Sequence, residues 1–194
     1  MTSLAKTNKL ISIGVDVGTV NGAISVVDED GNILLLTKAP YYQTEIKSRR
    51  NKSKPNKETG KYEADFRKRN WVDFTKLKEI LKPFLEYPKL YTIERIMNRA
   101  DETSASGFTN GNALGVFQGL YALLEPQAYF EPTPGEWKKA MGLGSVKDSS
   151  IALAEEIYKI KLKDYLPKGK VDDIAEALLL SFYGFKRYYE EKGK

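Results

Sequence analysis

Apolar residues alternate with small or polar ones at the start of the chain, which is the pattern of a β-strand. In the segment LISIGVDVG, isoleucine or valine occupies every second position, and this period of two predicts a half-buried strand. Two more strand-like segments follow: NGAISVVD after a short turn at Gly18 and Thr19, and NILLLTKA after the hairpin sequence DEDG. The first forty residues therefore predict a three-stranded antiparallel meander.

Helical periodicity dominates the rest of the chain. We expect a helix over residues 73–85, closed by Pro88, and an apolar helix in NALGVFQGLYALLE, where Gly115 and Gly119 stand four residues apart. Close packing of another helix would explain these glycines as well as any function would. Further helices are predicted in GEWKKAM, in residues 148–160 and in the final segment VDDIAEALLLSFYGFKRYY.

Two short strands separate these helices. KLYTIERI, which carries Glu94, and residues 127–131 both have strand-like composition. The resulting order, three strands and then helices alternating with strands, is typical of a mixed sheet covered by helices. We therefore predict a single α/β domain over residues 1–194, with a five-stranded sheet whose first three strands are antiparallel.

Residues 41–70 show no periodicity and are rich in Lys, Asn, Ser and Pro, which predicts a long basic loop inserted into the domain. Between residues 47 and 69, ten Lys and Arg face three carboxylates, a local excess of seven that exceeds the net charge of +5 of the whole chain. Such a segment favours a polyanionic partner, although a solvated flexible loop is the alternative. Tyr62, Phe66 and Trp71 interleave with the charges and favour nucleic acid, because bases stack on aromatic rings.

Composition removes several classes of chemistry. The chain contains no cysteine and no histidine, which excludes disulfides, thiolate catalysis, cysteine-based zinc sites and imidazole catalysis. No run of 18 apolar residues is present, and no apolar stretch precedes a cleavage site near the N-terminus. We therefore expect a cytoplasmic protein, in a bacterium or a phage-infected cell, with no membrane association.

Carboxylates stand at unusual positions. Asp16 interrupts an apolar strand, on the face of small residues that leave room for something to approach, and Glu94 ends another strand. Asp172, Asp173 and Glu176 lie within an arc of about 100° at the start of the last helix.

Each carboxylate taken alone also has a structural explanation. Asp172 is a candidate N-cap, and Asp173 would then stabilise the helix dipole. Glu94 could pair with Arg95 or Arg99, and Asp16 could cap the adjacent turn.

Together these acids favour a metal site, because they would repel one another without a divalent cation among them. Oxygen ligands without His or Cys favour Mg²⁺ or Mn²⁺. Two such ions can activate water and stabilise the leaving 3′ oxygen in phosphodiester hydrolysis. The candidate metal ligands are Asp16, Glu94, Asp172, Asp173 and Glu176.

Three segments together, GVDVGTVNGAISVVD, YTIERI and KVDDIAEALLLSFYG, resemble the RuvC-type Holliday junction resolvases, especially phage-encoded ones, of the RNase H-like (retroviral integrase) superfamily. The resemblance runs from about residue 10 to residue 185. It implies a homodimeric metal-dependent endonuclease that resolves four-way DNA junctions by symmetric nicks. It also implies catalytic, metal-binding roles for Asp16, Glu94, Asp173 and Glu176, with Asp172 competing for the place of Asp173.

The segment TPGEWKKAMGLGSVKDSSIALA resembles a family segment in which a lysine pair precedes a turn and another lysine opens a helix. The resemblance implies phosphate contacts for Lys138, Lys139 and Lys147, and a catalytic role for Lys147. We place the helix of Gly115 and Gly119 in the dimer interface. We expect the basic insertion to bind DNA as a clamp, through Arg49, Arg50, Lys52 and Lys54.

Other functions remain open. An actin-like ATP-binding protein would share DVGTVNGAISVVDEDG, but 194 residues leave no space for its second domain. A structural DNA-binding protein would not need the acidic set. A flap or branched-DNA nuclease, or a ribonuclease H, would share the fold and the chemistry, and the sequence does not separate these specificities.

Overall fold

The computed structural model describes residues 9–47, 66–96, 103–144 and 149–193, and its centre is a five-stranded sheet. The strands lie in the order β3-β2-β1-β6-β7; β2 pairs antiparallel with β1 and β3, whereas β6 is parallel to β1 and β7. The predicted mixed sheet with an antiparallel beginning is thereby confirmed. The strands are β1 (Ile11–Asp16), β2 (Ala23–Asp28), β3 (Ile33–Lys38), β6 (Lys89–Ile93) and β7 (Ala128–Phe130).

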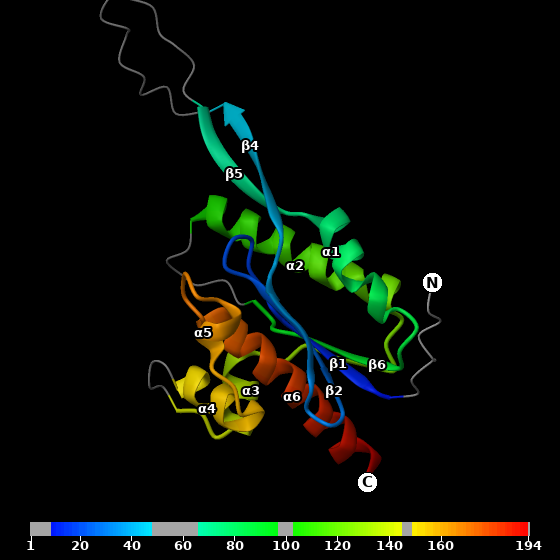
Figure 1. Cartoon of the computed structure of the whole chain (residues 1–194). Coiled ribbons are helices and arrows are strands. Elements are labelled where there is room, and N and C mark those ends of the chain that lie inside the picture. Colours follow the sequence, from blue (N-terminus) through cyan, green and yellow to red (C-terminus); the bar gives the residue numbers. More distant parts are fainter. Residues whose placement is uncertain (1–8, 48–65, 97–102, 145–148, 194) are drawn as a thin grey trace, which may run out of the picture.

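Helices cover both faces of this sheet (Figure 1). On one face lie α1 (Phe74–Leu81), the short 3-10 helix η1 (Lys82–Phe84) and α2 (Ser104–Leu124). On the other lie α3 (Pro134–Ala140), α4 (Ser149–Tyr158), α5 (Leu162–Tyr165) and α6 (Asp172–Lys192). Because helices pack on both sides, every residue of β1 except Asp16 is buried, and the expectation of a half-buried strand is wrong.

Small residues on β1 bring α6 against the sheet. A Cβ on Gly14 would lie 2.2 Å from the carbonyl oxygen of Ala177 and 2.4 Å from the amide nitrogen of Ser181. The Ser25 hydroxyl donates to the Ala177 carbonyl at 2.8 Å, and the Ser181 hydroxyl to the Ser12 carbonyl at 3.2 Å. Helix α6 therefore fills the space beside the small neighbours of Asp16. This packing brings the first turn of α6 to the end of β1.

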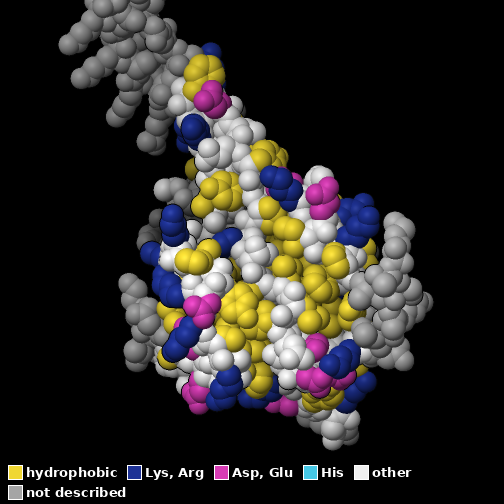
Figure 2. Space-filling view, viewed as in Figure 1, with side chains coloured by type: hydrophobic (Ala, Val, Ile, Leu, Met, Phe, Trp, Pro, Cys, Tyr) yellow, Lys and Arg dark blue, Asp and Glu magenta, His cyan; other side chains and the backbone are white. Residues whose placement is uncertain are grey.

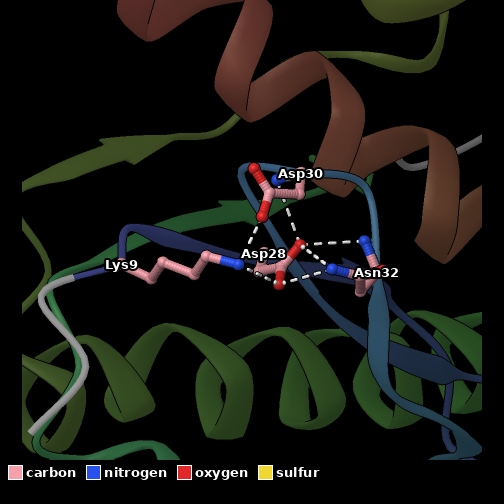
Figure 3. Close-up of polar contacts among 4 residues, drawn as sticks. All are labelled: Lys9, Asp28, Asp30 and Asn32. Atoms are coloured by element: carbon pink, nitrogen blue, oxygen red, sulfur yellow. Dashed lines mark hydrogen bonds and ion pairs between the residues drawn. The ribbon is translucent and has the colours of Figure 1, made fainter.

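The turn between β2 and β3 is held by the carboxylate of Asp28 (Figure 3). Its Oδ1 accepts from the backbone nitrogens of Asp30 at 3.0 Å and Asn32 at 2.8 Å, and Gly31 adopts φ 85°. Lys9 forms ion pairs with Asp28 at 3.4 Å and with Asp30. The hairpin predicted from the sequence DEDG is present.

The prediction of a loop over residues 41–70 is wrong at both ends of this range, where the chain forms strands. Strands β4 (Tyr41–Lys47) and β5 (Phe66–Val72) form an antiparallel ribbon that projects from the domain (Figure 1). Only Val72 is buried in these two strands, so no buried face demands apolar residues at alternate positions. The indole nitrogen of Trp71 donates to the Thr44 hydroxyl across the ribbon at 2.8 Å. Residues 48–65 lie outside the described part of the chain.

Helix α2 begins earlier than its apolar pattern indicated. Its N-cap is Thr103, whose hydroxyl accepts from the amide nitrogen of Ser106, so the polar segment before residue 112 is largely helical. A Cβ on Gly115 or Gly119 would meet nothing within 4 Å, so no helix among the described residues packs on these glycines. The short helix α5 was not predicted. None of the helices in the described ranges has the length and hydropathy needed to cross a bilayer.

Candidate active site

Three carboxylates from distant parts of the chain converge at one end of the sheet. Asp16 ends β1, Glu94 follows β6, and Glu176 lies in the second turn of α6. Parallel pairing aligns the ends of the two strands, and the Glu94 amide donates to the Val15 carbonyl at 3.1 Å. One carboxylate oxygen from each of the three residues lies within 4.8 Å of the others, and all three side chains are half-buried.

These carboxylates destabilise one another's charged forms. Burial raises the pKa of Asp16 well above its usual range, the charges of Glu94, Glu176 and Asp173 raise it further, and Lys38 opposes them. Burial likewise raises the pKa of Glu94 against the opposing hydrogen bond from Trp137. Perturbation by burial together with like charges is typical of functional sites.

Helix α3 supplies two side chains that orient the carboxylates. A capping box between Thr133 and Glu136 begins this helix, in which Trp137 is buried. The Trp137 indole donates to Glu94 Oε1 at 2.8 Å. The Lys138 ammonium donates to Glu176 Oε1, also at 2.8 Å. Two of the three acids thus have a fixed oxygen and a second oxygen available.

Asp173 lies beside the group but outside it. Its carboxylate forms an ion pair with Lys38 at the end of β3, while its charge still raises the pKa of Asp16. Asp172 is exposed and also lies outside the group of three. The N-cap of α6 is Val171, with no side-chain cap hydrogen bond, so the alternative of Asp172 as N-cap is wrong.

The other structural explanations for single acids do not hold among the described residues. Arg95 pairs with Glu131, at 3.7 Å, rather than with Glu94. No hydrogen bond within the described ranges involves the Asp16 carboxylate, so it does not cap the turn at Gly18 and Thr19.

The predicted lysines and arginines are placed only in part. Lys138 contacts the acidic group, whereas Lys139 is exposed and forms no ion pair with a described carboxylate. The remaining basic candidates, together with Arg99, lie outside the described residues: Arg49, Arg50, Lys52, Lys54 and Lys147.

Sequence reasoning missed three contacts of this site. Lys38 could have been found from the meander, because the register pairs Asp16 with Ala23 and Ala23 with Lys38. Trp137 carried no signal beyond its place in a short amphipathic segment. The Ser150 hydroxyl, which donates to Glu176 Oε1 at 3.3 Å, is one of two adjacent serines that open α4.

The donor set fits a hard divalent cation. It consists of carboxylate oxygens alone, which suit Mg²⁺, Mn²⁺ or Ca²⁺ better than zinc. Lys38 pairs with Asp173 and Lys138 with Glu176, so these two lysines offset only part of the negative charge of the site.

Comparison with known proteins places the fold. No protein-family model matches the chain, and no curated protein is significantly similar in sequence. Among solved structures, Thermus thermophilus RuvC in complex with a Holliday junction substrate superposes with a TM-score of 0.55 at 14% identity, over 95% of this chain and 96% of that one.

Two further structures are similar. A second T. thermophilus RuvC structure gives a TM-score of 0.52 at 15% identity, over 94% of this chain and 96% of that chain. The yeast mitochondrial Holliday junction resolvase Ydc2 gives 0.49 at 15% identity, over 93% and 79%. At such identity the likeness to RuvC concerns the fold, and this chain has the RNase H-like fold of RuvC.

Proposed function

We propose that this protein is a metal-dependent endonuclease that cuts branched DNA, with the four-way Holliday junction as its substrate. The observation that carries the proposal is the convergence of Asp16, Glu94 and Glu176 within 4.8 Å. It occurs in a fold shared with RuvC, whose structure was solved with a Holliday junction substrate. Acids gathered from three separate elements are costly to fold without a cation, which supports catalysis over a purely structural role.

Asp16, Glu94 and Glu176 would hold the metal, with Asp173 as a further ligand once it leaves Lys38. We propose Mg²⁺ or Mn²⁺ because the ligands are carboxylates only. We propose two ions per site because a pair can serve both the attacking and the leaving oxygen of phosphodiester hydrolysis. When bound, such ions supply the Lewis acid that activates water and stabilises the departing 3′ oxygen.

The protein's own residues prepare this chemistry. Trp137 holds Glu94 in one orientation through its indole hydrogen bond. Lys138 donates to Glu176 at 2.8 Å, and its ammonium group is proposed to contact the scissile phosphate beside the acidic group. Lys139 and Lys147 are proposed to contact phosphates beside it, with Lys147 in a catalytic role.

Junction resolution requires two nicks related by symmetry, so we propose a homodimer with one active site in each subunit. The exposed glycines 115 and 119 of α2 offer a surface on which a partner helix could pack closely. The basic insertion, through Arg49, Arg50, Lys52 and Lys54, is proposed to contact the phosphates of the junction arms.

A panel of substrates tests the proposal. The full-length protein is incubated with a synthetic four-way junction, a linear duplex of the same sequence and an RNA–DNA hybrid, each with and without Mg²⁺. We expect paired nicks in the junction only, and only with Mg²⁺. Preferential cutting of the hybrid would identify a ribonuclease H instead, and no cutting with Mg²⁺ or Mn²⁺ would refute the nuclease. Glu79→Gln serves as the control, because it removes an exposed acid of α1 that lies outside the group of three.

A further inference from the structure

Two adjoining hollows lie between the β4–β5 ribbon and the first turns of α2. One, of about 340 Å³, extends from Thr19 along β5, and the other, of about 480 Å³, extends to Lys47 and Phe108. Both are lined by Arg67, Arg69 and Ala105, so the two hollows adjoin, and together we call them the ribbon groove. Its size is that of a site for a nucleotide-sized ligand rather than for a whole duplex.

The ribbon groove is positively charged. Lys47, Arg67 and Arg69 line it, and none of the three forms an ion pair with a carboxylate in the described ranges. The other lining side chains are apolar, or carry hydroxyl, amide or ammonium groups, and none is acidic. Unbalanced cations that share one depression favour an anionic ligand, and the nearby N-terminus of α2 adds to that preference.

An exposed aromatic ring completes one side of the groove. Phe108 is 55% exposed, and Trp71 meets it edge-on with ring centroids 6.0 Å apart. The Arg69 guanidinium lies over both rings, 5.6 Å from Trp71 and 5.3 Å from Phe108. Figure 2 shows Lys and Arg side chains interleaved with hydrophobic ones along the projecting ribbon. A ring braced on one edge and open to solvent is a stacking platform for a nucleobase.

The other end of the groove opens at the loop that follows β1. Thr19, three residues after Asp16, lines it together with Val20. Thr19 is only 8% exposed, and its hydroxyl has no hydrogen-bond partner among the described residues. A buried hydroxyl without a partner is costly, and a phosphate oxygen entering here would satisfy it. The groove therefore begins at the loop that follows Asp16 in the chain and extends to the aromatic platform at Phe108.

We propose that the ribbon groove binds an unpaired DNA strand next to the branch point, with phosphates at Arg67, Arg69 and Lys47 and one base stacked on Phe108. The ligand is a single strand because bases inside a duplex are already stacked and cannot reach a side-chain ring. This inference rests on the proposed function for its ligand class. It goes beyond that function in assigning the single strand to a groove made by the ribbon.

Binding measured without cleavage tests the groove. The full-length protein, kept free of divalent ions by EDTA, is titrated with an oligothymidylate of about 12 nucleotides, within the usual range of site sizes, and with a blunt duplex. Phe108→Ala should weaken oligothymidylate binding about five- to a hundredfold without changing its salt dependence. The duplex should bind this variant as it binds the wild type. Phe108→Tyr keeps the ring and should restore binding.

Charge removal gives a separate readout. Log K falls as log salt rises, and each phosphate contact on a single strand contributes about 0.7 to the steepness of this fall. The double variant Arg67→Ala and Arg69→Ala should therefore make the slope less steep by about 1.4. The matched control removes two exposed cations of α1 and η1 outside the groove, by Lys78→Ala and Lys82→Ala, and should leave the slope unchanged.

The inference is overturned if Phe108→Ala binds oligothymidylate like the wild type, or if it loses duplex binding equally. It is also overturned if the control pair reduces the steepness of the salt dependence as much as the arginine pair does. Junction nicking with Mg²⁺ is scored separately. Nicking with normal binding by Phe108→Ala refutes only the groove, and groove-dependent binding without nicking refutes only the nuclease.

Discussion

The β1–β2 hairpin carries an aspartate at each of its ends, and the surroundings shift the pKa values of the two carboxyl groups in opposite directions. At the turn into β3, burial disfavours the charge of Asp28, but hydrogen bonds from Asn32 and the charge of Lys9 outweigh it and lower its pKa. At the other end, Asp16 accepts no hydrogen bond from a described residue, and burial and neighbouring acids raise its pKa. A carboxylate surrounded by donors stabilises a turn, whereas one surrounded by acids is prepared for a cation.

The largest expected effect is that of Asp16→Asn on nicking. The variant removes a proposed metal ligand, so Mg²⁺-dependent nicking of a four-way junction should fall by more than the about 10- to 100-fold typical of losing an outer-shell partner. Junction binding should persist, because the loss of negative charge does not disfavour a polyanion. Initial nicking rates and gel-shift titrations measure the two effects. Nicking within a few-fold of the wild-type rate would show that the acidic group is not the active site.

The second effect is on stability in the presence of metal. A cation that binds only the folded protein stabilises it by about 2.7 kcal/mol at one hundred times its dissociation constant. Increasing Mg²⁺ should therefore raise the midpoint temperature of thermal unfolding of the wild type. Asp16→Asn and Glu176→Gln should lose this increase, and Asp28→Asn should keep it, because Asp28 lies at the opposite end of the hairpin. An equal metal response in all variants would mean that the ions bind elsewhere.

A smaller effect is expected from the support of a single ligand. Trp137→Phe preserves a buried ring but removes the indole donor that holds Glu94 at 2.8 Å. Loss of such an outer-shell partner should lower nicking by about 10- to 100-fold. The Mg²⁺ concentration for half-maximal rate should rise in parallel, which a merely structural role would not cause. Tyr91→Phe is the matched control, since it also keeps a buried ring and removes a donor, here the hydroxyl that donates to the Phe117 carbonyl at 2.7 Å. Equal metal requirements for Trp137→Phe and the wild type would contradict the role.

The difference between the two ends also explains what could be predicted from the sequence. The turn of Asp28 is local chemistry within five residues, and the helix over residues 148–160 follows from its own periodicity, so both were found. Asp16 was singled out because aspartate is rare in an apolar strand. Lys38 was missed because its contact with Asp173 spans 135 positions and depends on strand register.

The ribbon shows the same limit. Strands β4 and β5 pair across the 18 residues that separate them in the chain, and only Val72 of the two strands is buried, so neither needs an alternating apolar face. Their pairing, and the approach of Phe108 to Trp71, are tertiary contacts between segments that are each polar in composition. Periodicity detects the elements that bury one face, and the candidate nucleic-acid surface of this molecule is built from elements that do not.

The smallest effect is expected at the turn itself. Because the pKa of Asp28 is lowered on folding, its ionised form adds stability above its unfolded pKa of about 3.9, and this contribution disappears as the pH falls through the folded value. Asp28→Asn should therefore destabilise the protein at pH 7, by about 1.5–3 kcal/mol for a lost hydrogen bond to the charged carboxylate, and the difference from the wild type should shrink below pH 4. Denaturant unfolding without Mg²⁺ at pH 7 and pH 3.5 measures this.

Asp16→Asn should change the free energy of unfolding in the opposite direction. It removes a charge whose ionisation opposes folding, so without metal it should stabilise the protein at pH 7. Equal signs for the two variants would mean that the hairpin's ends do not differ in the way their surroundings indicate.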